Sequence, residues 1–400
     1  MPKFLSKKAI ILFTVFVDVL GMGIVIPILP YYVKSFGVSD FTVTLLFSVF
    51  AACSFVSAPL LGAWSDRLGR RPILIASIIS TAIGWIVFAE ASSIWILFVG
   101  RIIDGLAAGN ISTAQSYLSD LSKTDKERTA NLGSIGAIVG MAFIVGPLIG
   151  GLLSTYSHAI PFWFVGIMAG VNALLAYFFL PESHTEKHVG KIDINPISPI
   201  VRGLRNANLR SDFLVWFIFG IAITAHQSVF ALFLDKVFGF GAVISGISMT
   251  GVGVVLTINQ GFLLKSVWLK YFKENQLEHG SIFILAISLF LMSIPWLGIF
   301  IAGIIGVAFA QSILRVVLTS KMVSKSDGRH GEVMGVSISI FSLSLIIGPI
   351  VGGALFGIQP YYPFLIGALL MVGTWFLSRH SYKKSITPDP TDIFPPASIS

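Results

Sequence analysis

The sequence predicts an all-α integral membrane protein with twelve transmembrane helices, and two features of its composition carry that prediction. Apolar residues make up 55% of the 400 residues and charged residues only 12%, whereas a soluble domain has about 25% charged residues. The apolar residues also gather into runs of about 20, the length that crosses the hydrocarbon core of a bilayer as a helix. Helices are expected because each backbone N–H and C=O in hydrocarbon must be paired within its own segment.

Charged or turn-rich breaks separate the apolar runs and define the expected spans. The twelve predicted spans are residues 8–33, 41–64, 72–90, 94–118, 130–155, 160–181, 212–236, 243–266, 278–297, 298–320, 332–357 and 361–379. The first run follows basic residues, but it is too long for a cleavable signal peptide and is interrupted by Asp18. We therefore expect it to remain as the first membrane helix.

Lys and Arg are concentrated in alternate loops, with 23 of the 27 on the side of the N-terminus. The opposite loops hold only Lys34 and Lys236, while Arg101 and Arg315 fall within spans. Because cytoplasmic loops are rich in Lys and Arg, we expect both termini to be cytoplasmic and, in a bacterium, the protein to lie in the inner membrane. This distribution accounts for the net charge of +8 without a nucleic-acid partner.

The longest polar break leaves six predicted spans on each side of it. The expected parts are an N-terminal six-helix bundle over 1–181, a cytoplasmic central loop over 182–211, a C-terminal six-helix bundle over 212–379 and a cytoplasmic tail over 380–400. The tail is rich in Pro and Ser, a composition typical of disorder.

A repeated pattern of Gly and Pro relates the two halves. The fifth span contains GSIGAIVGMAFIVGPLIGG from Gly133, and the eleventh contains GVSISIFSLSLIIGPIVGG from Gly335. At a constant offset of 202, the matched positions are Gly133, Gly146, Pro147, Gly150 and Gly151 with Gly335, Gly348, Pro349, Gly352 and Gly353. Duplicated six-helix halves with midplane binding sites are an architecture of transporters. Since small residues let membrane helices approach closely, both GPxxGG segments are expected at contacts between the halves.

Three charged residues are predicted to lie deep in the membrane. Asp18 comes ten residues into the first span, about 15 Å deep at ~1.5 Å per residue. Arg101 and Asp104 in the fourth span share one helical face by their i, i+3 spacing. Ionisable groups in a membrane are functional candidates by default. If the three meet, one arginine serves two carboxylates and the unmatched charge favours holding one proton, although structural hydrogen bonds between helices are the alternative.

The hinge LLGAWSDRLGRRPIL, Leu60 to Leu74, concentrates charge between the second and third spans. Its glycines allow close approach and a tight turn, its aspartate can accept from helix N-terminal amides, and its arginines stay charged. We interpret it as an anchored, charged latch rather than a topology signal alone. The expected latch residues are Gly62, Asp66, Arg67, Gly69 and Arg70, with Asp120 placed to join them.

This hinge resembles the GxxxDRxGRR signature between helices 2 and 3 of the major facilitator superfamily. DVLGMGIVIPILP from Asp18, RIIDGLAAG from Arg101 and GPLIGG from Gly146 resemble the helix 1, 4 and 5 signatures of its twelve-helix drug:proton antiporters. The resemblance covers about residues 8 to 380 and implies the major facilitator fold, two pseudo-symmetric six-helix bundles around a central cavity. It also implies that Asp66 and Arg70 pair with neighbouring helices to hold the cytoplasmic gate shut, and that the helix 5 signature serves antiport.

Within that family the motifs are most similar to the tetracycline/proton antiporters, through VDVLGMGIVIPILP, WSDRLGRRPIL and PESH. That subgroup carries further acidic residues inside helices 3 and 9. Here the third span has Gly84 at the corresponding place, and SIFILAISLFLMSIPW in the ninth span contains no acid. A tetracycline–metal chelate is therefore not the expected substrate, and a native metabolite, a siderophore or a different drug are open alternatives.

Other polar residues in the spans are candidates for lining a substrate cavity, with interhelical hydrogen bonds as the alternative for each. They are Asn110, Gln115, His226, Gln227 and Gln311. Arg315 is expected to reach the cytoplasmic interface instead. The single cysteine, Cys53, allows no intramolecular disulfide and no cysteine-based metal site. Because the chain lacks GxxxxGK[ST], HExxH and GxSxG, we expect no cofactor, no metal and no enzyme activity.

The sequence therefore predicts a secondary active transporter, a proton-coupled exporter of a small amphipathic organic compound that works by alternating access. One alternative is a facilitator or proton symporter that imports a metabolite, and another is a sensor with a transporter fold that moves nothing. The expected partners are the small-molecule substrate, protons and the lipid bilayer, and the expected oligomeric state is a monomer.

Overall fold

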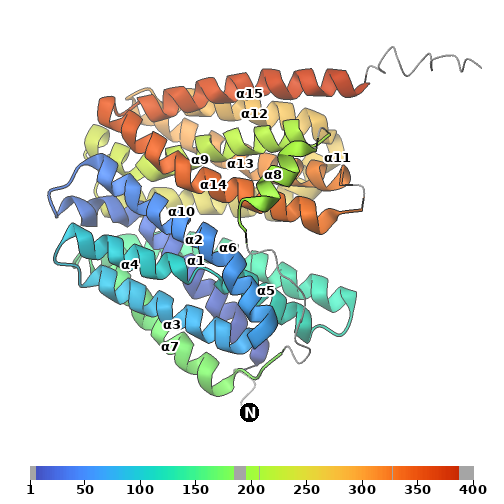
Figure 1. Cartoon of the computed structure of the whole chain (residues 1–400). Helices are drawn as coiled ribbons and strands as arrows, with labels where there is room; N and C mark the ends of the chain where they lie inside the picture. The colour runs from blue at the N-terminus through green and yellow to red at the C-terminus, as the bar shows by residue number, and fades with distance from the viewer. Residues whose placement is uncertain (1–5, 184–194, 207, 327, 387–400) are drawn as a thin grey trace, which may run out of the picture.

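The computed structural model describes residues 6–183, 195–206, 208–326 and 328–386. Within these ranges the chain is helical and contains no strand, and twelve helices are long and apolar enough to cross a membrane. Figure 1 shows two helical bundles packed side by side, formed by the two halves of the chain. The predicted fold class, with twelve spans divided six and six, is confirmed.

The helix bounds follow the predicted spans closely. The N-terminal bundle consists of α1 (Lys7–Lys34), α2 (Asp40–Leu68), α3 (Arg70–Ala89), α4 (Ile94–Leu106), α5 (Asn110–Leu121), α6 (Asp125–Leu153) and α7 (Ile160–Phe179). The C-terminal bundle consists of α9 (Arg210–Phe238), α10 (Ala242–Ile258), the π-helical η2 (Asn259–Trp268), α11 (Leu269–Tyr271), α12 (Glu274–Met292), α13 (Leu297–Ser324), α14 (His330–Ile358) and α15 (Tyr362–Ile386).

Two elements differ from the expected parts. The short helix α8 (Ser198–Arg205) lies within the stretch expected as a central loop. Helix α15 continues to Ile386, so residues 380–386 are helical rather than part of a disordered tail. The cause is compositional, because the first proline after this span is Pro388 and nothing before it forbids a helix. Residues 184–194 of the loop and 387–400 of the tail lie outside the described residues.

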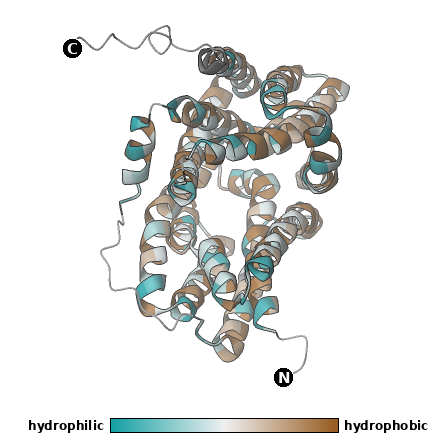
Figure 2. Cartoon of the chain, turned by 90° about the vertical axis from the view of Figure 1, so that its right-hand side faces the viewer, coloured by the Kyte–Doolittle hydropathy of each residue, from teal (hydrophilic) through white to brown (hydrophobic). Residues whose placement is uncertain are grey.

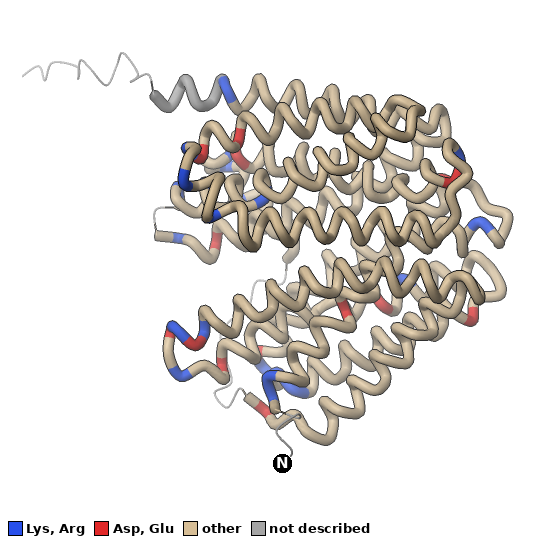
Figure 3. Tube along the Cα trace, turned by 180° about the vertical axis from the view of Figure 1, so that it is seen from behind, with Lys and Arg blue, Asp and Glu red and all other residues tan. Residues whose placement is uncertain are grey.

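We call the end where α1 begins and α15 finishes the terminal end, and the opposite end the distal end. Figure 2 looks at the terminal end, where hydrophilic residues gather at the helix ends, while hydrophobic residues prevail along the helices. Figure 3 shows Lys and Arg concentrated at the terminal end and sparse at the distal end. The helices therefore present an apolar length to lipid and carry most of their positive charge on one side.

The GPLIGG segment of α6 contacts helices in both bundles. A Cβ at Gly146 would lie 3.0 Å from the Leu20 carbonyl oxygen of α1, and one at Gly150 would lie 3.2 Å from Ile24. A Cβ at Gly151 would lie 3.4 Å from Val243 of α10, in the other bundle. The glycines therefore let α6 pack tightly on its own bundle and across the boundary.

The GPIVGG segment of α14 repeats this arrangement with the bundles exchanged. A Cβ at Gly352 would lie 2.7 Å from the Ala225 carbonyl oxygen of α9, in its own bundle. A Cβ at Gly353 would overlap the side chain of Thr44 on α2, in the other bundle. The repeat seen in the sequence thus corresponds to two equivalent seams, one on each side of the molecule.

The hydrogen bonds and ion pairs that join the bundles through described residues lie in the distal half of the helices. Lys34 on α1 pairs with Asp235 on α9 at 2.6 Å, and Lys236 pairs with Asp40 on α2 at 3.1 Å. Deeper in, the Tyr31 hydroxyl donates to the Phe240 carbonyl at 2.7 Å. These contacts close the distal end of the boundary.

Within the described ranges, these two seam helices make no hydrogen bond or ion pair to the other bundle at the terminal end. Gly133 is 18 residues, or five helical turns, from Gly151 and so lies on the same face of α6; Gly335 is likewise on the face of Gly353 on α14. Among the described residues, no atom lies within 4 Å of a Cβ built at Gly133 or Gly335. The bundles diverge toward the terminal end (Figure 3), and the conformation is closed distally.

Candidate functional site

The fourth span is interrupted inside the membrane, next to the predicted charges. Helix α4 ends at Leu106, and the Ala107 and Ala108 amides donate to the Asp104 and Gly105 carbonyls, each at 3.2 Å, three residues back. The Ser57 hydroxyl of α2 also donates to the Gly105 carbonyl at 2.9 Å. Irregular backbone at this depth is tolerated where neighbouring side chains satisfy it, and discontinuous helices mark binding sites in transporters.

The last turns of α4 hold a buried ion pair. Arg101 Nη1 lies 3.3 Å from Asp104 Oδ2, and the two residues are 4% and 6% exposed. The guanidinium carbon lies over the rings of Phe50, Trp85 and Phe88, 5.0 to 5.5 Å from their centroids. Cation–π contacts of this kind stabilise a desolvated arginine. The pair and its aromatic surround keep one positive and one negative charge together within the bundle.

Asp18 on α1 is placed differently. Its Oδ1 accepts a hydrogen bond from Asn110 Nδ2 at 3.0 Å, and the same amide lies 3.3 Å from Thr81 Oγ1. Asp18 is partly exposed, whereas Asn110 is 2% exposed. The expectation that Arg101 serves both carboxylates is thus only partly met: Arg101 pairs with Asp104, and the described partner of Asp18 is a neutral amide.

Gly84 shows why the third span, whose one acid is Glu90 at its distal end, carries none at this position. A Cβ at Gly84 would lie 2.9 Å from both the Cβ and the backbone nitrogen of Asp104, so α3 and α4 touch here backbone to backbone. No side chain fits at Gly84 without separating the helices. The carboxylate at this contact comes from Asp104 on α4 instead.

The latch residues form a cluster within the N-terminal bundle. Arg70 forms an ion pair with Asp66, and its Nε lies 3.3 Å from Asp120 Oδ2 on α5. Arg70 Nη1 also donates to Ser65 Oγ at 3.3 Å. Arg67 is exposed in the last turn of α2, and a Cβ at Gly62 would meet no described atom within 4 Å. In this conformation the described partners of Arg70 all belong to its own bundle.

Glu182 is a member of this cluster that the sequence reasoning missed. Its two carboxylate oxygens accept from the Arg70 and Arg71 amides at 2.8 and 3.2 Å. Gly69 precedes them with φ +112°, a conformation that favours glycine, and so exposes the first amides of α3. A carboxylate there satisfies unpaired N–H groups and complements the helix dipole. The signal was the acid in PESH, directly after the sixth span.

A second buried cluster lies at the terminal end of the C-terminal bundle, and it too was missed. Lys321 on α13 lies 2.7 Å from Glu278 on α12 and 3.0 Å from Asp212 on α9. Lys325 also pairs with Asp212 at 2.6 Å, and the Ser378 hydroxyl of α15 donates to Glu278. Glu278 and Asp212 are 0% and 2% exposed. The cluster joins four helices with two acids and two lysines.

This cluster also corrects the description of the ninth span. Although Ser281 to Trp296 contains no acid, α12 begins at Glu274 and buries Glu278 completely. The burial is possible because Lys321 and Ser378 supply its hydrogen bonds, as a buried carboxylate requires.

The residues proposed to line a substrate cavity lie in different surroundings. Asn110 belongs to the Asp18 contact. His226 lies 7% exposed between α9 and α15, with its ring 6.0 and 5.8 Å from the rings of Phe230 and Phe364, inside the C-terminal bundle. Gln115 on α5 is exposed, Gln227 on α9 is half-buried and Gln311 on α13 is 8% exposed.

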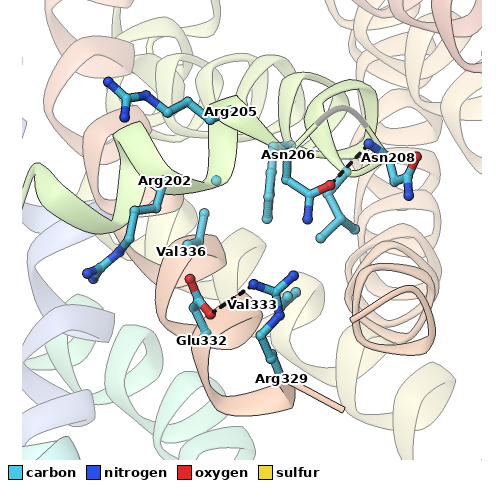
Figure 4. Close-up of a pocket in the computed structure, with 11 residues that line it drawn as sticks. Arg202, Arg205, Asn206, Asn208, Arg329, Glu332, Val333 and Val336 are labelled. Atoms are coloured by element: carbon cyan, nitrogen blue, oxygen red, sulfur yellow. Dashed lines mark hydrogen bonds and ion pairs between the residues drawn. The ribbon is translucent and has the colours of Figure 1, made fainter. Parts of the chain in front are cut away.

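One hollow of about 460 Å³ lies elsewhere, at the terminal end between α8 and α14 (Figure 4). Arg329 and Glu332, three residues apart at the start of α14, pair at 3.8 Å on one side of it, whereas Arg205 points away. Its lining contains none of the predicted site residues. Among the described residues, no group of three or more His, Cys, Asp and Glu is placed to hold a metal ion.

Comparison with known proteins agrees with this architecture. The family model of the Major Facilitator Superfamily matches residues 11–328. Multidrug resistance protein 2 of Bacillus subtilis (strain 168) is 29% identical over 374 residues, which are 91% of this chain and 92% of the relative. Tetracycline resistance protein, class C, of Escherichia coli is 30% identical over 362 residues, 87% of this chain and 89% of the relative.

Among solved structures, the human organic anion transporter MFSD10 (TETRAN) matches with a TM-score of 0.70 at 22% identity, over 94% of this chain and 100% of that chain. At that identity the likeness shows the fold alone. The family model, in contrast, matches residues 11–328, which is most of the chain, and this match shows the family as well as the fold. This multi-pass membrane protein belongs to the major facilitator superfamily, whose members transport small molecules across membranes.

Proposed function

We propose that this protein is a proton-coupled exporter of a small amphipathic organic compound, with Asp18 as the group that binds the coupling proton. The observation that carries the proposal is the contrast between its two membrane carboxylates. Asp104 is buried against Arg101, while Asp18 is partly exposed and held by the neutral Asn110. A membrane carboxylate with no cationic partner is stabilised by a proton. The multidrug and tetracycline resistance relatives support export.

The interrupted fourth span would hold these groups in place. Asn110 is the first residue of α5, directly after the break, so a shift of α5 against α4 would move Asn110 relative to Asp18. Arg101 and Asp104 on α4 would serve as the neutral, fixed part of the site. In this account, proton exchange at Asp18 accompanies movement of the bundles.

We place the cytoplasm at the terminal end, because basic residues gather there (Figure 3). The conformation then opens to the cytoplasm and is closed on the outside by Lys34, Asp235, Lys236 and Asp40. Compounds would enter the space between the bundles from inside, and the distal seam would open to release them. Both termini would be cytoplasmic, the protein would act as a monomer in a bacterial inner membrane, and nucleic acid would have no part.

The latch would act when the terminal end closes. In the open conformation Arg70 holds Asp66 and Asp120 within one bundle, and Gly62 has space beside it. Closure would bring this surface, with Arg67 and Gly69, against the C-terminal bundle. The paired seams at Gly146, Pro147, Gly150 and Gly151 and at Gly348, Pro349, Gly352 and Gly353 would exclude water on the distal side.

The experiment uses everted vesicles energised by a proton gradient, with an internal pH-sensitive dye. A panel of amphipathic cations, anions and antibiotics is added to vesicles that contain the wild type or Asp18→Asn. We expect substrate-dependent proton release from the wild type and none from Asp18→Asn. Asp125→Asn, which removes an exposed carboxylate outside the seams and the distal ion pairs, is the control and should still release protons.

Three outcomes would contradict the proposal. Proton release that persists in Asp18→Asn would remove Asp18 from coupling. Equal equilibration of a radiolabelled compound by wild type and Asp18→Asn, without proton movement, would identify a facilitator. Accumulation of a compound together with protons would identify a symporter that imports.

A further inference from the structure

Arg315 is a charged residue inside a membrane span with no ion-pair partner among the described residues. It lies on α13, nine residues before the helix ends at Ser324, which places it about 14 Å from the terminal end of that helix. Its side chain is exposed, and its one described side-chain contact is with an aromatic ring. Charged groups at such positions pair with one another or face a water-filled cavity.

The packing of α13 shows which way Arg315 faces. Ile313 and Val317 pack with Leu277 of α12, and Lys321 bonds to Glu278 on the same helix. Arg315 is two residues from both Ile313 and Val317, or about 200° around the helix, so it points away from α12. Figure 1 shows α12 and α15 on the side of the C-terminal bundle farthest from the N-terminal bundle. Arg315 therefore lies on the side of α13 that is turned toward the N-terminal bundle.

An aromatic wall lies beside it. The guanidinium carbon is 5.3 Å from the centroid of the Phe341 ring on α14, and that ring packs on Trp216 of α9 at 5.3 Å. Among the described hydrogen bonds, none uses a donor of the Arg315 guanidinium, so its N–H donors are available to a ligand beside the ring. Those donors match a carboxylate or sulfonate, which they can bind in a bidentate geometry.

The opposite bundle presents the complementary charge at a similar depth. Asp18 lies 11 residues after α1 begins at Lys7, about 16 Å from the terminal end, and it is partly exposed. A negative group is therefore disfavoured near Asp18 and favoured near Arg315. The space between the bundles is polarised, with its positive side on α13.

We propose that Arg315 is a substrate-recognition residue and that the transported compounds are amphipathic anions. The anionic group binds the in-plane donors of Arg315, and a flat apolar body lies against Phe341. This proposal rests on the proposed function, because that function places Arg315 beside a transport cavity. It names the chemical class of substrate, which the proton-coupling assignment leaves open.

The test measures equilibrium binding to the purified full-length protein in detergent, with no proton gradient. The probes are 1-pyrenebutyrate and 4-(1-pyrenyl)butyltrimethylammonium, which share the aromatic body and differ in the sign of charge. We expect the wild type to bind the anion more tightly. Arg315→Gln should weaken anion binding about 10- to 100-fold, as expected for loss of hydrogen bonds to a charged group, and leave cation binding unchanged.

Two further variants separate recognition from folding. Arg315→Lys keeps the charge but loses the paired donors of the guanidinium, so it should recover only part of the affinity for the anion and bind the cation like the wild type. Arg379→Gln is the matched control, because Arg379 on α15 is also exposed and lies 5.0 Å from the centroid of the Trp375 ring; it should bind both probes like the wild type.

Equal binding of the two probes by the wild type would overturn the inference, as would equal weakening of both by Arg315→Gln. Because the assay involves no proton movement, its result is independent of the Asp18 experiment. A facilitator that recognises anions would pass this test and fail the vesicle test, and a proton-coupled exporter of cations would do the reverse.

Discussion

The two bundles place their buried charges at different depths. In the N-terminal bundle, Arg101 and Asp104 pair deep in the membrane, with Asp18 nearby on a neutral partner. In the C-terminal bundle, Lys321 and Lys325 are matched against Asp212 and Glu278 at the terminal end. Yet the seams at α6 and α14 have glycines at matched positions, although the contact at Gly353 is tighter than the contact at Gly151.

We propose that this difference reflects a division of labour between the two bundles. The contacts that hold the halves together are needed on both sides, so both copies of GPxxGG form seams. The charges are not repeated. Balanced charges that join four helices stabilise one arrangement of the C-terminal bundle, whereas an acid without a cation can gain and lose a proton. The N-terminal bundle would then handle protons and the C-terminal bundle would provide a rigid counterpart.

The largest effect on stability is expected from Lys321→Met. The substitution leaves Glu278 buried without a described cationic partner and Asp212 paired with Lys325 alone. Breaking a buried ion pair by removing one partner costs about 3–5 kcal/mol. Thermal unfolding of the purified protein in detergent measures this loss of stability. Asp125→Asn, in the exposed pair with Arg128, is the matched control and should change the free energy of unfolding by less than about 1 kcal/mol.

The double variant Lys321→Met, Glu278→Gln tests whether the charges of the C-terminal cluster serve stability alone or proton coupling as well. Removing both charges should recover part of the stability, and the double variant should still couple transport to protons, because Asp18 is untouched. Loss of coupling in a stable double variant would show that the C-terminal cluster handles protons as well.

An intermediate effect is expected where the two seams differ in tightness. Gly353→Ala must displace the fully buried Thr44, whereas Gly151→Ala would place its Cβ 3.4 Å from Val243, an ordinary contact. Overpacking of this kind costs about 1–3 kcal/mol. We expect Gly353→Ala to lower both the melting temperature and the transport rate, and Gly151→Ala to resemble the wild type. Equal effects of the two variants would contradict the packing described for these seams.

The smallest effect is expected from Glu182→Gln. The substitution keeps the shape of the side chain but removes the negative charge at the N-terminus of α3, and such an interaction contributes about 0.3–1 kcal/mol. The melting temperature should fall slightly, and by less at high salt because exposed charges are screened. A decrease as large as that of Lys321→Met would mean that the latch cluster is also a structural core.

Much of the fold followed from local sequence. Apolar runs marked the twelve spans, and the i, i+3 spacing of Arg101 and Asp104 placed them within 3.3 Å of each other. The glycine repeat indicated the seams because glycine has one common use between membrane helices, close approach. These features depend on residues near one another in the chain or on a repeated pattern.

The rest depended on contacts between distant segments. Asn110 meets Asp18 because α4 ends at Leu106 and a new helix, α5, begins at Asn110. From the sequence, by contrast, the motif RIIDGLAAG was expected to lie in one continuous helix. Glu278 looked like the edge of a span because its partner, Lys321, is contributed by another helix. Asp120 was expected to join the latch and lies 3.3 Å from Arg70, whereas Glu182 was missed because it contacts the start of α3 from 112 residues away in the chain.

The central claim is that Asp18, and not Asp104, is the carboxylate that exchanges a proton. Infrared difference spectra of the purified protein between acidic and alkaline buffer, recorded for the wild type, Asp18→Asn and Asp104→Asn, test it most directly. We expect the band of a protonated carboxyl group to appear at acidic pH in the wild type and in Asp104→Asn, and to be absent from Asp18→Asn. A band that persists in Asp18→Asn and disappears in Asp104→Asn would contradict the account and assign the proton to the arginine-paired acid.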